Sequence, residues 1–154
     1  MLFRSPRVIL IKLADRLEVM RSLEMFPREK WRKKSWESMN LYAQIAHKLG
    51  LYSIKSELED IALKYLEPKD YEHVVTKLEE SAEERKAFIG RFLVPIEQRL
   101  NRLGIKYHIK SRTKSIFSIW NKMHKQHVPF EGVYDIFAIR IIIDCPQEAE
   151  KQLC

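Results

Sequence analysis

The stretch Gly104-Ile105-Lys106-Tyr107-His108-Ile109-Lys110 separates two different patterns in this sequence. From Ile105 onward, apolar residues alternate with charged or polar ones, the two-residue period of a strand with one covered face. Before Gly104, apolar residues recur at steps of three and four, the period of amphipathic helices. We therefore expect a helical protein that ends in an α/β region.

Helices are expected before that glycine at residues 8–23, 28–50, 53–66 and 71–78. Phe26-Pro27 separates the first two, because proline cannot continue the hydrogen-bond ladder of a helix. Gly50 is suited to end the second helix, and Ser53 is a candidate cap of the third. The second helix should bury a broad stripe, formed by Trp36, Met39, Leu41, Tyr42, Ile45, Ala46 and Leu49.

The domain organisation follows from charge and period. Residues 79–86 are so highly charged that we predict a solvated linker or an exposed helix start, and a long helix then reaches Gly104. A helix should begin at about Thr113, and residues 133–143 have the apolar, β-branched character of an interior strand covered on both faces. The expected fold is mainly α: a helical bundle at residues 1–80, a connecting helix at 81–104, and a partial α/β domain at 105–154.

Positive charge is concentrated in one part of the chain, whose formal charge is +7. Between Gln98 and Phe130 there are eight basic residues and no Asp or Glu. The rest of the chain has the other 20 of the 28 basic residues and all 21 acidic ones, so it is nearly neutral. This local basicity suits phosphate, on nucleotides or nucleic acid. The eight residues are Arg99, Arg102, Lys106, Lys110, Arg112, Lys114, Lys122 and Lys125.

A helix from Thr113 would place its cations on one face, opposite an apolar face that packs on a sheet. An anion could lie along this basic face and against the N-terminal amides of the helix, and Arg112 could add a bidentate contact. The alternative is an ordinary solvated face. The basic face contains Lys114, Ser118, Asn121, Lys122 and Lys125.

Asp135 is a lone carboxylate at the entry to the apolar run. It could hold Mg²⁺ beside nucleotide phosphates, because this hard cation prefers oxygen ligands and shares them with substrate. A turn or capping aspartate after Gly132 is the alternative, and the residues alone favour it.

Several stretches also resemble the Rel/Spo (RelA/SpoT) family of long (p)ppGpp synthetase/hydrolases. Residues 111–123 and 130–140 resemble the opening of its synthetase domain. Residues 11–17 resemble the last metal-ligand helix of its HD-type hydrolase domain, and residues 42–50 and 54–60 resemble the stretch that follows. The resemblance implies a fragment that spans the end of the hydrolase domain and the start of a nucleotidyltransferase-like synthetase domain.

For the synthetase half, the resemblance implies transfer of pyrophosphate from ATP to the 3′-hydroxyl of GTP or GDP. Arg112, Lys114, Ser118 and Lys122 would contact ATP, and Asp135 would bind Mg²⁺. Ser111 stands where the family motif usually has glycine. The resemblance places the rest of the guanine-nucleotide site beyond Cys154, so we expect no synthetase turnover from these residues alone.

For the hydrolase half, the resemblance gives Asp15 a metal-ligand position, with Mn²⁺ only where an upstream site is intact. Glu18 and Val19 replace a histidine and a substrate-contacting asparagine, which implies a degenerate hydrolase. The family's other metal ligands would precede Met1. His47, the nearest histidine, is expected to be a packed or helix-end residue.

A competing interpretation is a non-catalytic regulatory module that binds nucleotide or RNA, and a weaker one is a helical interaction domain without ligand.

Cys145 and Cys154 lack the spacing of a zinc site, and no apolar run is long enough for a membrane span. We expect a cytoplasmic protein with no membrane association. A strand edge left uncovered after Ile143 favours self-association, and the ribosome is a candidate partner of the parent protein.

Overall fold

The computed structural model describes residues 6–144, which fall into two compact units. The first unit contains Met1–Val75 and Ser115–Val133, and the second contains Thr76–Lys114 and Tyr134–Cys154. Cys145 and Cys154 lie outside the described residues. Within residues 6–144, every helix is too short or too polar to cross a membrane.

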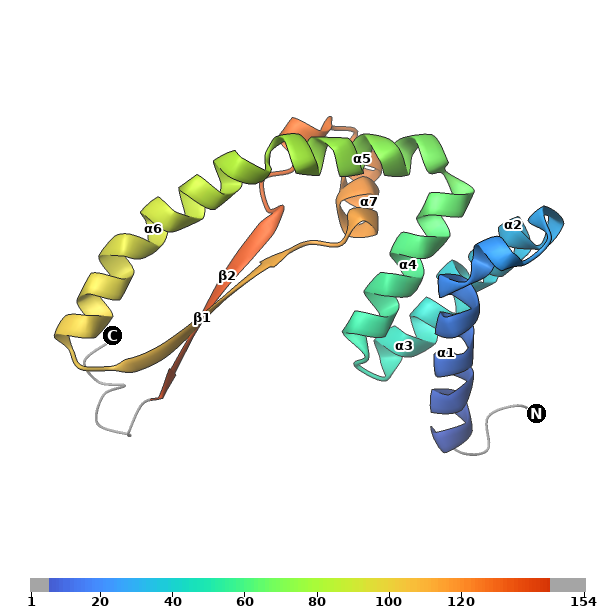
Figure 1. Ribbon diagram of the computed structural model, residues 1–154, viewed down its shortest axis with the longest axis horizontal. Coiled ribbons are helices and arrows are strands. Elements are labelled where there is room, and N and C mark those ends of the chain that lie inside the picture. The colour runs from blue at the N-terminus through green and yellow to red at the C-terminus, as the bar shows by residue number, and fades with distance from the viewer. Residues whose placement is uncertain (1–5, 145–154) are drawn as a thin grey trace. The chain divides into compact units, whose positions relative to one another are not determined.

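The first unit is entirely helical over its described residues (Figure 1). The helical periods of the sequence are confirmed, since a helix covers each segment where one was expected. Its elements are α1 (Pro6–Arg21), the 3₁₀ turn η1 (Leu23–Met25), α2 (Arg28–Glu37), the π-helical turn η2 (Ser38–Tyr42), α3 (Ala43–Lys48), α4 (Tyr52–Leu66), the start of α5 (Pro68–Glu80), α7 (Ile116–Gln126) and the 3₁₀ turn η3 (Phe130–Gly132).

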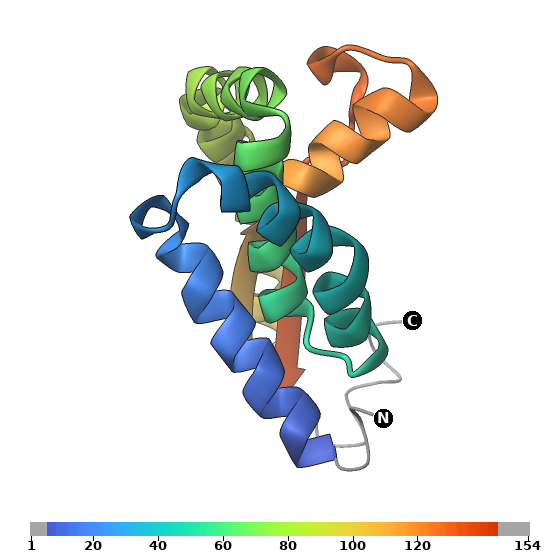
Figure 2. The same cartoon turned by 90° about the vertical axis from the view of Figure 1, so that its right-hand side faces the viewer.

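The core of this unit lies where α1, α3 and α4 pack together, as Figure 2 shows from the side of α1. Burial of one leucine side chain stabilises a fold by about 1.5–3 kcal/mol, so this cluster accounts for the packing of the helices. The buried residues are Leu13, Leu17, Met20, Leu23, Ala43, Ala46, Leu58 and Ala62.

The predicted buried stripe of the second helix is partly wrong. Trp36, Leu41 and Leu49 are 60%, 50% and 43% exposed. Small side chains such as Ser35 and Ala43 face inward instead, and their size lets α4 approach the helices of residues 28–48 closely. The extra residue of the π-helical turn also changes which residues face inward after Ser38.

One expected helix cap is wrong, and one expected helix start is confirmed. Ser53 does not cap α4, because Leu51 occupies the N-cap position without a side-chain hydrogen bond. Of the two alternatives for residues 79–86, the exposed helix start is confirmed, since α5 runs to Glu80 and α6 (Ala82–Arg102) begins directly after Ser81. The charged side chains of this stretch therefore lie on helices, where solvent exposure makes their charge compatible with helical structure.

The second unit pairs α6 with an antiparallel ribbon of β1 (Lys106–Thr113) and β2 (Phe137–Asp144). Gly104 ends α6 with φ of 65°, a conformation that glycine adopts without steric cost. One face of the ribbon packs toward α6, where the rings of Phe88 and Phe137 meet edge to face at 6.0 Å. The half-buried strand that starts the α/β region is confirmed.

The last predicted strand is corrected in extent and environment. It begins at Phe137, because residues 130–132 form a 3₁₀ turn and residues 133–136 have no regular secondary structure. Its side chains alternate between half-buried and exposed, and Ile142 is 41% exposed. Over the described residues β2 pairs only with β1, which leaves its other edge unpaired, and the alternating burial shows that just one of its faces is covered.

Candidate functional site

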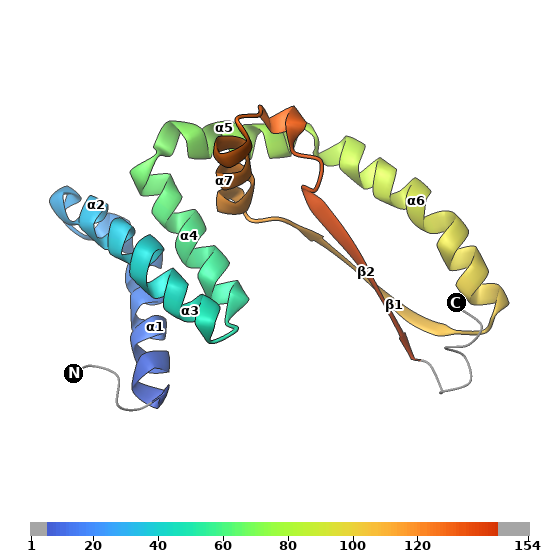
Figure 3. The same cartoon turned by 180° about the vertical axis from the view of Figure 1, so that it is seen from behind.

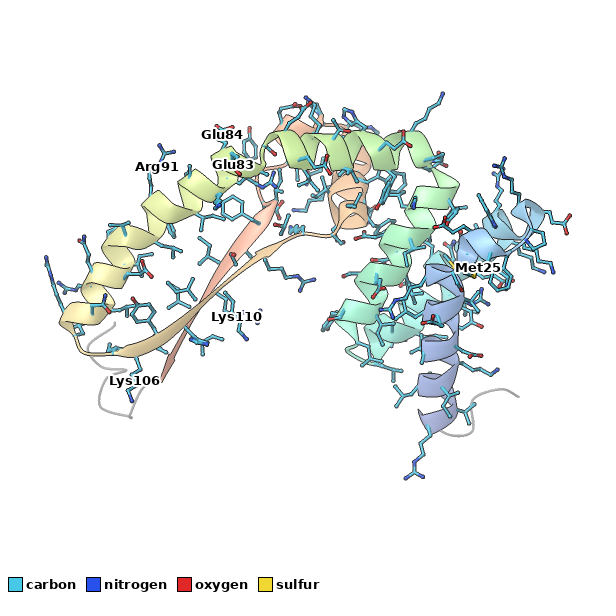
Figure 4. All side chains as sticks on the ribbon, viewed as in Figure 1. Met25, Glu83, Glu84, Arg91, Lys106 and Lys110 are labelled. Atoms are coloured by element: carbon cyan, nitrogen blue, oxygen red, sulfur yellow. The ribbon has the colours of Figure 1, made fainter. Side chains whose placement is uncertain are left out.

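The outer face of β1 is strongly basic. Lys106, His108 and Lys110 are exposed, as the alternating pattern predicted, and Figure 4 labels the two lysines on this strand. Arg112 continues the same row, and on the neighbouring strand Arg140 lies opposite Lys110. Alternate residues of a strand are about 6.6 Å apart, so these cations follow one another at regular spacing along the ribbon.

The row ends at an ion pair between Lys114 and Asp135. The Lys114 ammonium donates to Oδ2 of Asp135, and the backbone N–H of Lys114 donates to the carbonyl of Ile136 at 2.8 Å. The two side chains are 33% and 51% exposed. The structure thus brings together a predicted phosphate contact and the predicted Mg²⁺ ligand, and it does so without burying either charge fully.

Lys114 is not part of the following helix, which corrects the predicted basic face. The helix α7 begins at Ile116, and Ser115 caps it by accepting a hydrogen bond from the Ser118 amide at 3.3 Å. The side chains of Ser115 and Ser118 share a further hydrogen bond at 2.7 Å. A serine at the N-cap therefore starts the helix about three residues later than expected, and it fixes the hydroxyl of Ser118 near the helix end.

The N-terminal amides of α7 already face an anion. The amide of Phe117 donates to Oδ1 of Asp60 on α4 at 2.8 Å, and the Ile116 amide also bonds to this carboxylate. Burial raises the pKa of Asp60, and these two amide bonds only partly offset that rise. The prediction that these amides would hold the phosphate is wrong, because Asp60 occupies that position.

The apolar face of α7 packs within the first unit and not on a sheet as expected. Ile119 is fully buried, and α7 lies beside α4, which Figures 1 and 3 both show. The indole N–H of Trp120 donates to Oδ2 of Asp70 at 2.7 Å, and Nε2 of His124 lies 3.5 Å from the same oxygen. Carboxylates from α4 and α5 therefore both hold this helix.

The predicted ATP contacts are divided between the two units. Arg112 and Lys114 belong to the second unit together with Asp135, whereas Ser118 and Lys122 belong to the first. Lys114 and Ser115 are consecutive residues, so the chain itself links the two groups. Lys122 is half-buried on α7, and Lys125 is exposed.

Asp15 lies on α1 at a small cavity of about 210 Å³. The same cavity is lined by Val19, Lys12 and Tyr42, while Arg16 donates to Glu37 at 3.0 Å. Residues 6–144 contain no group of three or more His, Cys, Asp or Glu side chains that could hold a metal ion. His47 is exposed in the last turn of α3, as expected of a helix-end histidine.

Asp60 and Asp70 were not predicted from the sequence as residues of the site. Their acidic neighbours and helical setting make both look like ordinary surface residues, and the residues they contact are 57 and 50 positions away. A weak signal existed for Asp60, which ends the stretch of residues 54–60 that resembles the RelA/SpoT family. A tertiary contact of that separation cannot be read from local periodicity.

Two family models match this chain. Residues 1–52 match the model of the HD domain, and residues 111–153 match a region found in RelA / SpoT proteins. The second range includes every residue predicted to contact ATP, as well as Asp135. The fold and the site thus define a class: an HD-type helical region followed by the beginning of a RelA/SpoT region.

Relatives align along nearly the whole chain. It is 42% identical to a guanosine-3′,5′-bis(diphosphate) 3′-pyrophosphohydrolase of Aquifex aeolicus, over 94% of this chain and 21% of the relative. It is 38% identical to a GTP pyrophosphokinase of Streptomyces coelicolor, over 97% and 18%, and 36% identical to the bifunctional (p)ppGpp synthase/hydrolase RelA of Mycobacterium tuberculosis, over 92% and 19%. The chain belongs to the RelA/SpoT family, and it spans about a fifth of the length of these relatives.

Proposed function

We propose that this chain is part of a GTP pyrophosphokinase that makes (p)ppGpp in the stringent response. The reaction would transfer pyrophosphate from ATP to the 3′-hydroxyl of GTP or GDP. The relatives named for this activity support the proposal. The structural observation that supports it best is the ion pair of Lys114 and Asp135, within the residues that match the RelA/SpoT region.

In this proposal Arg112, Lys114 and Lys122 bind the phosphates of ATP and offset the negative charge that builds up on the transferred group. Ser118 supports the same phosphates from the first turn of α7. The complete enzyme must also hold the ribose hydroxyl in line with the transferred phosphorus, since positioning supplies much of the rate.

Asp135 is the proposed ligand of Mg²⁺. A single half-exposed carboxylate fits this cation, which usually takes one or two protein carboxylates and completes its shell with phosphate oxygens and water. When bound, Mg²⁺ would neutralise phosphate charge.

We further propose that residues 1–80 are the end of a degenerate hydrolase domain, 81–104 a connecting helix, and 105–154 the start of the synthetase domain. Asp15 would then be a vestigial metal position. Val19 supports this proposal, since it lines the cavity beside Asp15 and its side chain cannot form a hydrogen bond with a substrate. Mn²⁺ would be a cofactor only if an intact site is completed upstream.

The partners proposed for the whole protein are ATP, GTP or GDP, and the ribosome, in the cytoplasm. The one-sided pairing of β2 over the described residues supports self-association through that edge.

The test is calorimetric titration of the chain with ATP and Mg²⁺, alongside a Lys114→Ala, Lys122→Ala variant. Each charged hydrogen bond is worth about 1.5–3 kcal/mol, so the variant should lose at least roughly tenfold in affinity. Arg91→Ala, on the exposed side of α6 (Figure 4), is the matched control and should bind as the wild type does. Equal binding by wild type and double variant would refute the assignment, and so would the absence of binding by the wild type.

A second candidate is a regulatory module that binds RNA, favoured by the basic outer face of β1. Salt dependence separates the two functions. RNA binding through many phosphates weakens steeply as salt rises, whereas a mononucleotide site responds less and prefers Mg²⁺.

A further inference from the structure

The orientation of α7 decides where two of the proposed ATP contacts lie. Ser118 and Lys122 are one turn apart on this helix and therefore project from the same side. A rotation of α7 about its axis would move both side chains together. Contacts that prevent this rotation should therefore affect the affinity for nucleotide.

Two carboxylates outside the RelA/SpoT match hold α7 at successive turns. Asp60 on α4 accepts from the Phe117 amide at 2.8 Å, and Asp70 on α5 accepts from the Trp120 indole at 2.7 Å. The two donors are separated by about 4.5 Å along the helix axis, since each residue rises 1.5 Å. Two such points, with Ile119 fully buried between them, fix both the position of the helix and its rotation.

These carboxylates are not a general feature of helix packing. An apolar neighbour would cover Ile119 equally well, whereas Asp60 is a charged group that burial makes costly to ionise. Its carboxylate occupies the helix end that would otherwise attract a phosphate, which leaves the side chains of α7 to bind the nucleotide.

We propose that Asp60 and Asp70 are positioning residues for nucleotide binding, which hold α7 so that Ser118 and Lys122 face the phosphates of ATP. This inference rests on the proposed function. It assigns to the helices before residue 81 a direct role in the synthetase site.

The test compares Asp60→Ala and Asp60→Asn in the full 154-residue chain, with two readouts. Hydrogen exchange of the Phe117 amide reports whether its hydrogen bond to Asp60 is formed, and titration with ATP and Mg²⁺ reports nucleotide binding. Asp60→Ala should speed exchange and weaken ATP binding, each by about tenfold for one lost hydrogen bond. Asp60→Asn should rescue both, because its amide oxygen accepts the same bond. Glu72→Ala, an exposed carboxylate on α5, should change neither.

The outcomes separate this inference from the proposed function. If the wild type binds ATP and Asp60→Ala leaves either readout unchanged, the positioning role is overturned and the nucleotide site stands. If the wild type does not bind ATP, the nucleotide site fails and the positioning role fails with it. Should Asp60→Ala not fold, Trp120→Phe removes the indole donor to Asp70 while it keeps an aromatic ring beside Phe117, and the same two readouts then decide the question.

Discussion

The ammonium of Lys114 pairs with Oδ2 of Asp135, which joins the end of β1 to the segment before β2. In the proposed function these two groups have different ligands: phosphate for the lysine, and Mg²⁺ for the aspartate. In the ion pair, the positive charge of Lys114 and the negative charge of Asp135 neutralise each other. A nucleotide with its cation can then replace this one ion pair with two, phosphate with Lys114 and Mg²⁺ with Asp135.

Asp135→Asn is expected to abolish most of the Mg²⁺ dependence of ATP binding, because a neutral amide is a weaker ligand for a hard cation. We expect ATP affinity in the presence of Mg²⁺ to fall by about tenfold or more, while affinity in its absence should not fall, because Lys114 then lacks its carboxylate partner. Titrations with and without Mg²⁺ measure both. Glu84→Gln, an exposed change on α6, is the control (Figure 4). An undiminished Mg²⁺ effect in Asp135→Asn would show that the cation binds elsewhere.

Stability should depend on pH through Asp60. Burial raises its pKa in the folded chain, so the folded state holds this proton more tightly than the unfolded state does. The free energy of unfolding therefore falls as pH rises from the unfolded pKa to the folded one, and it is highest below both. Asp60→Asn should remove this contribution. Denaturant titrations across the acidic range should show the variant gaining stability relative to wild type as pH rises, and a constant difference would contradict the expectation.

Two glycines of the second unit should respond oppositely to alanine. Gly104→Ala places a side chain in the left-handed region at φ of 65°, with an expected loss of about 1–2 kcal/mol. Gly90→Ala lies within α6, where a Cβ would meet nothing within 4 Å, and helix propensity predicts a gain of up to about 1 kcal/mol. Thermal or denaturant unfolding measures both. A stabilising Gly104→Ala would argue against this helix end.

Ser35→Ala should be neutral or stabilising by about 1 kcal/mol. The Ser35 hydroxyl is fully buried on α2 and has no hydrogen-bond partner among residues 6–144, so its removal relieves a desolvation cost. Ser38→Ala is the matched comparison, since the Ser38 hydroxyl is equally buried but donates to the Lys34 carbonyl at 2.7 Å. Chemical denaturation should rank Ser35→Ala above Ser38→Ala in stability, and the reverse order would contradict the assigned hydrogen bonds.

The match between prediction and structure is best where a local rule applies. Pro27 and Gly50 bound the second helix as expected, because each restricts or frees its own backbone whatever surrounds it. The alternation from Ile105 to Lys110 likewise gave the half-buried β1. The predictions failed where apolar character was equated with burial, as at Trp36, since a hydrophobic residue lies inside only if another element covers it.

The sequence by itself determined the helical and strand periods, the local concentration of positive charge, and the motif residues from Arg112 to Asp135, because each depends on neighbours along the chain. Only the tertiary structure decided that Lys114 pairs with Asp135 and that Asp60 and Asp70 hold α7. These contacts join residues 21, 57 and 50 positions apart. Such contacts form only when whole helices and strands pack together, so they cannot be predicted from the pattern of neighbouring residues.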